Sequence, residues 1–240
     1  MNLIKPNCRV QFTAEDVDFI TEVLGSRGAG ASSSCLTQLL ADESSRDLLL
    51  DDDSLLAALL EHRGCLKVSS HLYFYVMVRH ALRRAGIDQR EVADYVAELL
   101  TEFSLQQRIA APVQGGGAPP EYFFEMVAAL GTADDLGRFA IRAHMGNQSL
   151  FMTGVFPERI RRRAETRGFP DLSYYEALGR SSFREISHHR LAERYHLGGV
   201  FETLGERFQE ARHALNDLAD RVFTLGEDPH AFDGLLRRTT

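Results

Sequence analysis

Residues 201–222 read FETLGERFQEARHALNDLADRV, and this stretch carries the clearest structural pattern of the chain. Its apolar side chains recur at alternating spacings of three and four residues: Phe201, Leu204, Phe208, Ala211, Leu215, Leu218 and Val222. On an α-helix this spacing gathers them into one continuous seam. The seam predicts a long C-terminal amphipathic helix. We expect the seam to pack against other helices of the same chain, and the alternative is a homodimer interface.

The remainder of the chain also favours helix. Capping residues precede apolar runs that repeat every three to four residues, and glycine follows several of them. No run alternates strictly between apolar and polar residues, as a strand would. Ser69 or Ser70 precedes 72–78, a run that is apolar on all sides and is therefore expected at the centre of the core. The sequence predicts an all-α, multi-helix bundle of roughly ten helices.

Two further helices are predicted from local signals. One of them runs near 45–62 and is rich in leucine. The other opens at Asp88, which forms a capping-box pattern with Glu91. Asp94 and Glu98 fall between the apolar positions of this second helix, so we expect their carboxylates to lie away from its buried face.

The stretch 112–120 contains three consecutive glycines and two adjacent prolines. Such a composition is typical of a linker between folded units. It predicts an N-terminal helical half, 1–111, and a C-terminal helical half, 119–240, joined by a Gly/Pro-rich linker at 112–120. The two halves are expected either to abut as separate units or to form one compact domain.

Composition restricts the class of protein. The chain has 240 residues, of which 44% are hydrophobic and 25% are charged, so it can bury a sizeable core. Three widely spaced cysteines without a C-x-x-C pair argue against a disulfide framework or a cysteine zinc site. No apolar run has the length of a signal peptide or a membrane span, so we expect a cytoplasmic protein with no membrane partner.

The basic residues also carry information. Only Lys5 and Lys67 of the 27 basic residues are lysines, and this arginine bias is typical of a GC-rich bacterial genome. The net charge is -7, which makes nucleic acid an unlikely partner because nucleic-acid binding draws on an excess of positive charge.

Three segments place a glutamate three residues before a histidine: Glu185 and His188, Glu193 and His196, Glu210 and His213. On a helix this spacing puts carboxylate and imidazole on one face, as in the helical bundles that hold two iron or manganese ions. Relative to the seam of 201–222, the third pair faces away from the core and predicts a solvated surface. The candidate metal ligands are therefore the first two pairs. The favoured expectation is that the protein has no cofactor, and iron or manganese is the alternative.

A short predicted helix after Pro157 is rich in arginine: Arg159, Arg161, Arg162, Arg163 and Arg167. Arginine binds carboxylate and phosphate groups through paired hydrogen bonds. Arg159, Arg162 and Arg163 are therefore candidates for binding an anion or an acidic partner. The favoured interpretation is a solvated helix whose arginines pair with acids of the chain itself, such as Glu158 and Glu165.

Polar residues at the edges of apolar segments suggest a third candidate site. Arg79 and His80 follow the apolar run 72–78, and His144 opens a segment that mixes apolar with amide and hydroxyl side chains. Polar groups close to a core need hydrogen-bond partners. We expect them to bond to helix ends and to each other, and the alternative is a small ligand pocket between the two halves.

These observations lead to two hypotheses of function. The chain has no phosphate-binding glycine loop and no nucleophile elbow. The leading hypothesis is a non-catalytic cytoplasmic protein that acts through protein–protein or small-ligand binding, with self-association through helices as one form. The alternative is a metal-dependent oxidoreductase of the di-iron or di-manganese type with carboxylate and histidine ligands. Whether the protein is an enzyme is left open.

Overall fold

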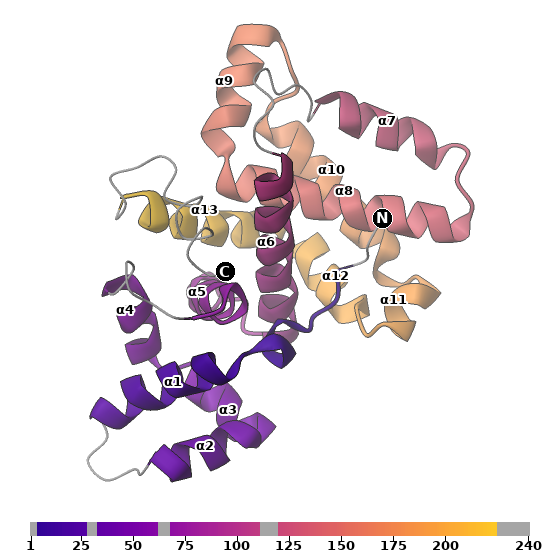
Figure 1. Ribbon diagram of the computed structural model, residues 1–240. Coiled ribbons are helices and arrows are strands. Elements are labelled where there is room, and N and C mark those ends of the chain that lie inside the picture. The colour runs from indigo at the N-terminus through magenta and orange to yellow at the C-terminus, as the bar shows by residue number, and fades with distance from the viewer. Residues whose placement is uncertain (1–3, 28–32, 62–67, 111–119, 225–240) are drawn as a thin grey trace.

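The computed structural model describes residues 4–27, 33–61, 68–110 and 120–224 (Figure 1). These residues form thirteen α-helices and one short 3-10 helix and contain no strand, which confirms the all-α prediction. The elements before residue 111 are η1 (Cys8–Gln11), α1 (Ala14–Arg27), α2 (Ser33–Ala41), α3 (Glu43–Leu50), α4 (Asp53–Glu61), α5 (Ser70–Arg84) and α6 (Arg90–Ala110). Those after it are α7 (Pro120–Leu130), α8 (Asp135–Val155), α9 (Pro157–Arg167), α10 (Leu172–Ser187), α11 (Arg190–Arg194), α12 (Gly198–Glu206) and α13 (Phe208–Thr224).

The centre of the molecule is built on α5. Its hydroxyl cap is Ser69, whose side chain accepts a hydrogen bond from the backbone N–H of Leu72. All seven residues of 72–78 are buried, as the apolar run predicts. α5 packs against α6 on one side and against α13 on another, so each of its faces meets another element. A helix without a polar face is stable in water only in such a position.

The C-terminal helices approach one another closely because glycines stand at their crossings. A Cβ atom on Gly179 of α10 would lie 2.6 Å from the ring of Phe208, and one on Gly146 of α8 would lie 2.7 Å from the ring of Phe183. Both distances are shorter than any real carbon–carbon contact, so a side chain at either position would push the helices apart. The absent side chains let the aromatic rings fill the interface.

The predicted seam is buried, but it belongs to two helices rather than one. From Phe201 to Leu218 its members are fully or almost fully buried within this chain, which confirms the intramolecular interpretation; the side chain of Val222 lies outside the described residues. The helix breaks at Arg207, between α12 and α13. The guanidinium group of Arg207 donates to the carbonyl of Ala85 at 3.0 Å and also to that of Gly86, so it holds the end of α5.

Two other local predictions were wrong. The helix predicted near 45–62 is divided into α3 and α4 by Asp51 and Asp52. The capping box of Asp88 does not form, because α6 begins at Arg90 and the Asp88 carboxylate accepts a hydrogen bond from Arg79 instead. In both places the buried Arg79 forms an ion pair with an aspartate, Asp51 or Asp88, that the local sequence pattern assigns to a helix.

The largest hydrophobic cluster draws on both halves of the chain. Tyr95 of α6 packs edge-on against Phe201 of α12, with ring centroids 5.6 Å apart, and its hydroxyl donates to Asn147 Oδ1 of α8 at 2.7 Å. A smaller cluster lies between α7, α8, α9 and α10. Of the predicted linker 112–120, only Pro120 is among the described residues. Within the described ranges no helix is both long and apolar enough to cross a membrane.

Candidate functional site on helix α9

Helix α9 stands on the surface at one end of the molecule, above α8 in Figure 1. Pro157 occupies its first turn, where a missing N–H costs nothing, and Gly168 ends it in the left-handed conformation with φ of +66°. Ile160 is its buried residue and anchors the helix in the smaller hydrophobic cluster with Phe123 and Tyr175. The remaining surface of α9 is therefore free to carry charge.

Four arginines form what we call the arginine face of α9: Arg159, Arg162, Arg163 and Arg167. Three of them follow one another at intervals of four residues and therefore form a row along the helix. Arg159, Arg162 and Arg167 are exposed and Arg163 is half-buried. Among the described residues, none of the four has a carboxylate within ion-pair distance, whereas Arg161 on the opposite side pairs with Glu158. Pairing with acids of the chain, the favoured interpretation from sequence, therefore extends only to Arg161.

The positive charges of Arg159, Arg163 and Arg167 destabilise one another. Partial burial, together with the charges of Arg159 and Arg167, lowers the pKa of Arg163. Three like charges at one-turn spacing repel one another, and nearby carboxylates would remove that repulsion. The geometry therefore suits a partner that brings negative groups to several points along the helix.

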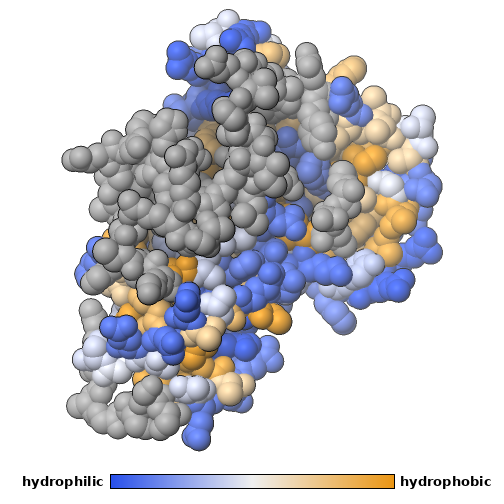
Figure 2. Space-filling model, viewed as in Figure 1, coloured by the Kyte–Doolittle hydropathy of each residue, from blue (hydrophilic) through white to orange (hydrophobic). Residues whose placement is uncertain are grey.

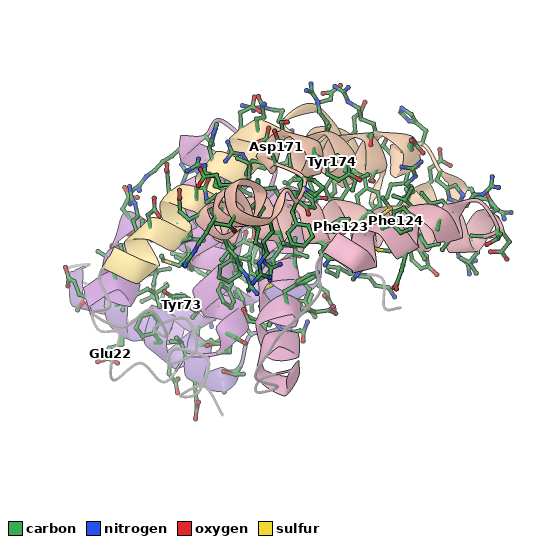
Figure 3. All side chains as sticks on the ribbon, turned by 90° about the horizontal axis from the view of Figure 1, so that it is seen from above. Glu22, Tyr73, Phe123, Phe124, Asp171 and Tyr174 are labelled. Carbon is green, nitrogen blue, oxygen red and sulfur yellow. The ribbon has the colours of Figure 1, made fainter. Side chains whose placement is uncertain are left out.

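The helices that share a hydrophobic cluster with α9 also carry exposed aromatic side chains. α7 and α9 share the smaller hydrophobic cluster, in which the rings of Phe123 and Tyr175 lie 5.3 Å apart. The residues that follow and precede this pair, Phe124 and Tyr174, are 75% and 44% exposed. Figure 3 labels both residues, and Figure 2 shows apolar surface over the α7 region at the upper right. Exposed aromatic residues are a feature of binding surfaces.

Two hollows formed by described residues border α9, and neither of these two is a deep pocket. One has a volume of about 10 Å³ and is lined by Arg159, Ile160, Arg163 and Tyr175, which is room for a single water molecule. The other, of about 410 Å³, opens to solvent between the opposite side of α9 and the first turn of α10, where Asp171 caps the helix. The surface of α9 therefore suits an extended partner better than an enclosed small molecule.

The four candidate metal ligands do not converge. Glu185, His188, Glu193 and His196 are all exposed, and Glu185 forms an ion pair with Arg142 at 2.7 Å. Among the residues that the structure describes, no three His, Cys, Asp or Glu side chains are grouped so that they could hold a metal ion. The reason lies in the local fold.

A metal site built from these pairs requires each glutamate and its histidine to share a helix. His188 instead follows the last residue of α10, and His196 lies beyond the end of α11 with φ of +55°. The Glu-x-x-His pairs therefore straddle helix ends. The third pair, Glu210 and His213, lies on the outward side of α13, as its position relative to the seam predicts.

The three candidate pocket residues do not line a common cavity among those that the described residues form. Arg79 is buried against Asp51 and Asp88, and His80 Nδ1 lies 3.3 Å from Asp53. His144 stacks on Phe103. A cavity of about 30 Å³ borders His80, but neither Arg79 nor His144 lines it. The favoured interpretation, in which these groups bond to neighbours, describes Arg79 well.

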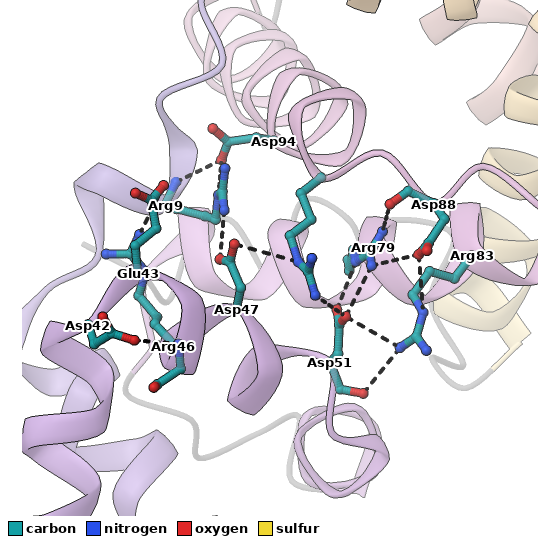
Figure 4. A network of polar contacts seen from close by, with 12 residues as sticks. Arg9, Asp42, Glu43, Arg46, Asp47, Asp51, Arg79, Arg83, Asp88 and Asp94 are labelled. Carbon is teal, nitrogen blue, oxygen red and sulfur yellow. Dashed lines mark hydrogen bonds and ion pairs between the residues drawn. The ribbon is translucent and has the colours of Figure 1, made fainter.

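Arg79 belongs to a network of arginines and aspartates that joins α3, α5, α6 and the N-terminal segment (Figure 4). Asp51 also accepts from Arg90 at 2.8 Å, and Asp47 accepts from Arg9 at 2.6 Å. Charges of both signs balance within this network, so its positive members are occupied. It fixes the N-terminal helices to α5 and α6 rather than presenting free charge to a ligand.

Sequence reasoning missed the burial of two acids on α6. Asp94 accepts from the backbone N–H of Arg9 at 2.9 Å, and both carboxylate oxygens of Glu98 accept from Gln11. Burial raises the pKa of Glu98 to about 7. The two acids are four residues apart and so share a face, but the spacing does not tell whether that face is covered. The 3-10 helix η1 covers that face, and nothing in the polar sequence of η1 indicates that it packs against α6.

No known protein family, curated protein or solved structure matches this chain.

Proposed function

We propose that this is a non-catalytic cytoplasmic protein that acts by binding, and that the arginine face of α9 is its docking surface for a partner protein with carboxylate groups. The observation that carries the proposal is the row of Arg159, Arg163 and Arg167, which has no ion-pair partner among the residues that the structure describes. Elsewhere in the described chain, buried or bridging arginines such as Arg79 and Arg90 have aspartate partners. A protein partner fits better than nucleic acid, because the net charge of -7 would repel a polyanion.

The expected strength of binding follows from the chemistry. An exposed ion pair contributes about 0.2–1 kcal/mol, so three or four of them give weak binding that salt screens. Contact of an apolar side chain of the partner with Phe124 or Tyr174 would add to it, because aromatic residues supply much of the energy at interfaces. We therefore expect a transient complex with a strong dependence on ionic strength.

A peptide titration tests the proposal. The probe is a fluorescein-labelled helical peptide with glutamates at four-residue spacing and one phenylalanine, followed by fluorescence anisotropy in 50 mM and 500 mM NaCl. We expect binding at the lower salt concentration and at least a tenfold weakening at the higher one. The triple substitution Arg159→Gln, Arg163→Gln, Arg167→Gln should weaken binding at low salt by at least tenfold.

The matched control changes three other exposed arginines. Arg138, Arg180 and Arg194 have no carboxylate within ion-pair distance in the described part of the chain, and their replacement by glutamine alters the net charge equally. This control should bind the peptide within twofold of the unchanged protein. Equal weakening by both triple variants, or no binding at 50 mM NaCl, would contradict the proposal.

A further inference from the structure

A second row of unpaired charge, of the opposite sign, lies on α1. Glu15, Asp18 and Glu22 are exposed and follow one another at spacings of three and four residues. Among the described residues none of them has a cation within ion-pair distance, whereas acids elsewhere, such as Asp47 and Glu176, are paired with arginines. Asp16, between them in sequence, is buried and bonds to Ser69. Because Asp16 faces the protein, the other three acids form the outward face of the helix.

The acidic row of α1 and the arginine face of α9 have matching dimensions. A helix rises about 1.5 Å per residue, so Glu15 to Glu22 spans about 10.5 Å and Arg159 to Arg167 spans about 12 Å. Each row places three charges within one side of its helix at intervals of about one turn. Laid side by side, the two helices could therefore form three ion pairs at once.

The two rows cannot meet within one molecule. Figure 1 shows α1 at the lower end of the structure and α9 at the upper end, with α5, α6 and α8 between them. The arginine face of one molecule can, however, form ion pairs with the acidic row of a second molecule. Such a contact joins different surfaces of the two copies, so it repeats along a series of molecules unless a ring closes.

We infer that the arginine face of α9 binds the acidic row of α1 of a second copy of this chain, in a head-to-tail arrangement. The inference rests on the proposed function in one respect, that the α9 face is a docking surface, and it names the occupant. It does not use the seam of α12 and α13, because that seam is already buried within the chain. Self-association is therefore electrostatic, and raising the salt concentration should dissociate the complex into single chains.

Sedimentation velocity on the full chain tests the inference. At 50 mM NaCl we expect the weight-average mass to rise above the 26.9 kDa of one chain as protein concentration increases, and at 500 mM NaCl we expect it to return to that value. Reversing the charges of Arg159, Arg163 and Arg167 to glutamate should leave a monomer at low salt. Reversing Glu15, Asp18 and Glu22 to arginine should do the same. Circular dichroism confirms that each variant is folded, and the glutamine triple variant of α9 replaces the reversed one if that one unfolds.

The decisive measurement mixes the two reversed variants. In the mixture each basic row again has an acidic row to meet, so the mass should rise as it does for the unchanged chain. A chain that carries all six substitutions should also self-associate. A mixture that stays monomeric overturns the inference, and so does an unchanged chain that stays at one mass at every concentration. If that chain still binds the acidic peptide through α9, the proposed function stands while the inference fails.

Discussion

Arg79 and Asp51 form a two-point ion pair across α5 and the end of α3: Arg79 Nε lies 2.7 Å from Asp51 Oδ1, and Nη2 lies 3.0 Å from Oδ2. Arg79 is 1% exposed and also donates to the backbone carbonyl and the carboxylate of Asp88. Each charge of the pair thus compensates the other, and neither would be stable in this buried position by itself. Buried charges persist only where every donor and acceptor is satisfied.

Arg79→Met should destabilise the fold. Removing Arg79 takes away the two-point partner of Asp51 and leaves Arg90 and Arg83 as its remaining cations, so we expect a cost of about 2–3 kcal/mol. Urea denaturation followed by circular dichroism measures it. Arg83→Met is the matched control, since Arg83 also approaches Asp51 but is half-exposed, and its loss should cost less than about 1 kcal/mol. Equal costs for the two variants would show that burial of Arg79 is not what makes the pair strong.

Glu98 should make stability fall as the pH rises. Burial raises the pKa of its carboxyl to about 7 in the folded state, above the ordinary value of 4.5. The folded state therefore binds this proton more tightly than the unfolded state does. The resulting stability is fully present below about pH 4.5 and is lost as the pH rises through about 7.

Glu98→Gln removes this titration. Its stability relative to the unchanged protein, measured by urea denaturation at pH 5 and pH 8, should improve by roughly 2 kcal/mol at the higher pH. Asp94 and Glu102, whose pKa values burial also raises, remain in both proteins, so their contribution largely cancels in the comparison. A difference that does not change between the two pH values would show that Glu98 is ionised alike in the folded and unfolded states.

Gly179→Ala should destabilise the packing of α10. The added methyl group would lie 2.6 Å from the Phe208 ring and 2.7 Å from Ser149, and overpacking of this kind costs about 1–3 kcal/mol. Thermal denaturation followed by circular dichroism should show a lower midpoint. Gly199→Ala is the control, because no atom lies within 4 Å of its added methyl group. We expect that variant to be neutral or more stable by up to about 1 kcal/mol.

Freshly purified protein should contain less than one tenth of an equivalent of iron or manganese per chain. The four candidate ligands are exposed and do not converge, and exposed pairs of this kind bind these metals weakly. Elemental analysis by mass spectrometry checks this. A variant with alanine at 185, 188, 193 and 196 should keep its thermal midpoint within a few degrees. One equivalent of metal that disappears in this variant would reinstate the oxidoreductase hypothesis.

Local patterns in the sequence predicted those features that depend on residues close together in the chain. The cap at Ser69 and the burial of 72–78 follow from a single helical segment, and the seam from Phe201 to Leu218 follows from its repeat. The direction of His213 followed from the same repeat, because one buried stripe fixes every other side chain on a regular helix.

The features that escaped prediction depend on partners far away in sequence. The break at Arg207 is tied to carbonyls of Ala85 and Gly86, more than 120 residues earlier. The carboxylate of Glu98 is buried because Gln11 reaches it from the N-terminal segment. No periodicity within 91–102 contains that information. The arginine-rich run after Pro157 is visible in the sequence, but the lack of carboxylates near it, among the described residues, depends on the three-dimensional fold.

The shared core has a consequence for synthesis of the chain. α13, the last helix among the described residues, lies directly against α5, and Tyr95 meets its aromatic neighbour only after Phe201 has been added. During synthesis, the apolar surface of the first hundred residues that α12 and α13 cover therefore stays exposed until those helices have been added. During that interval the nascent chain would most need a chaperone. A truncation before residue 201 would leave this apolar surface exposed and the chain prone to aggregation.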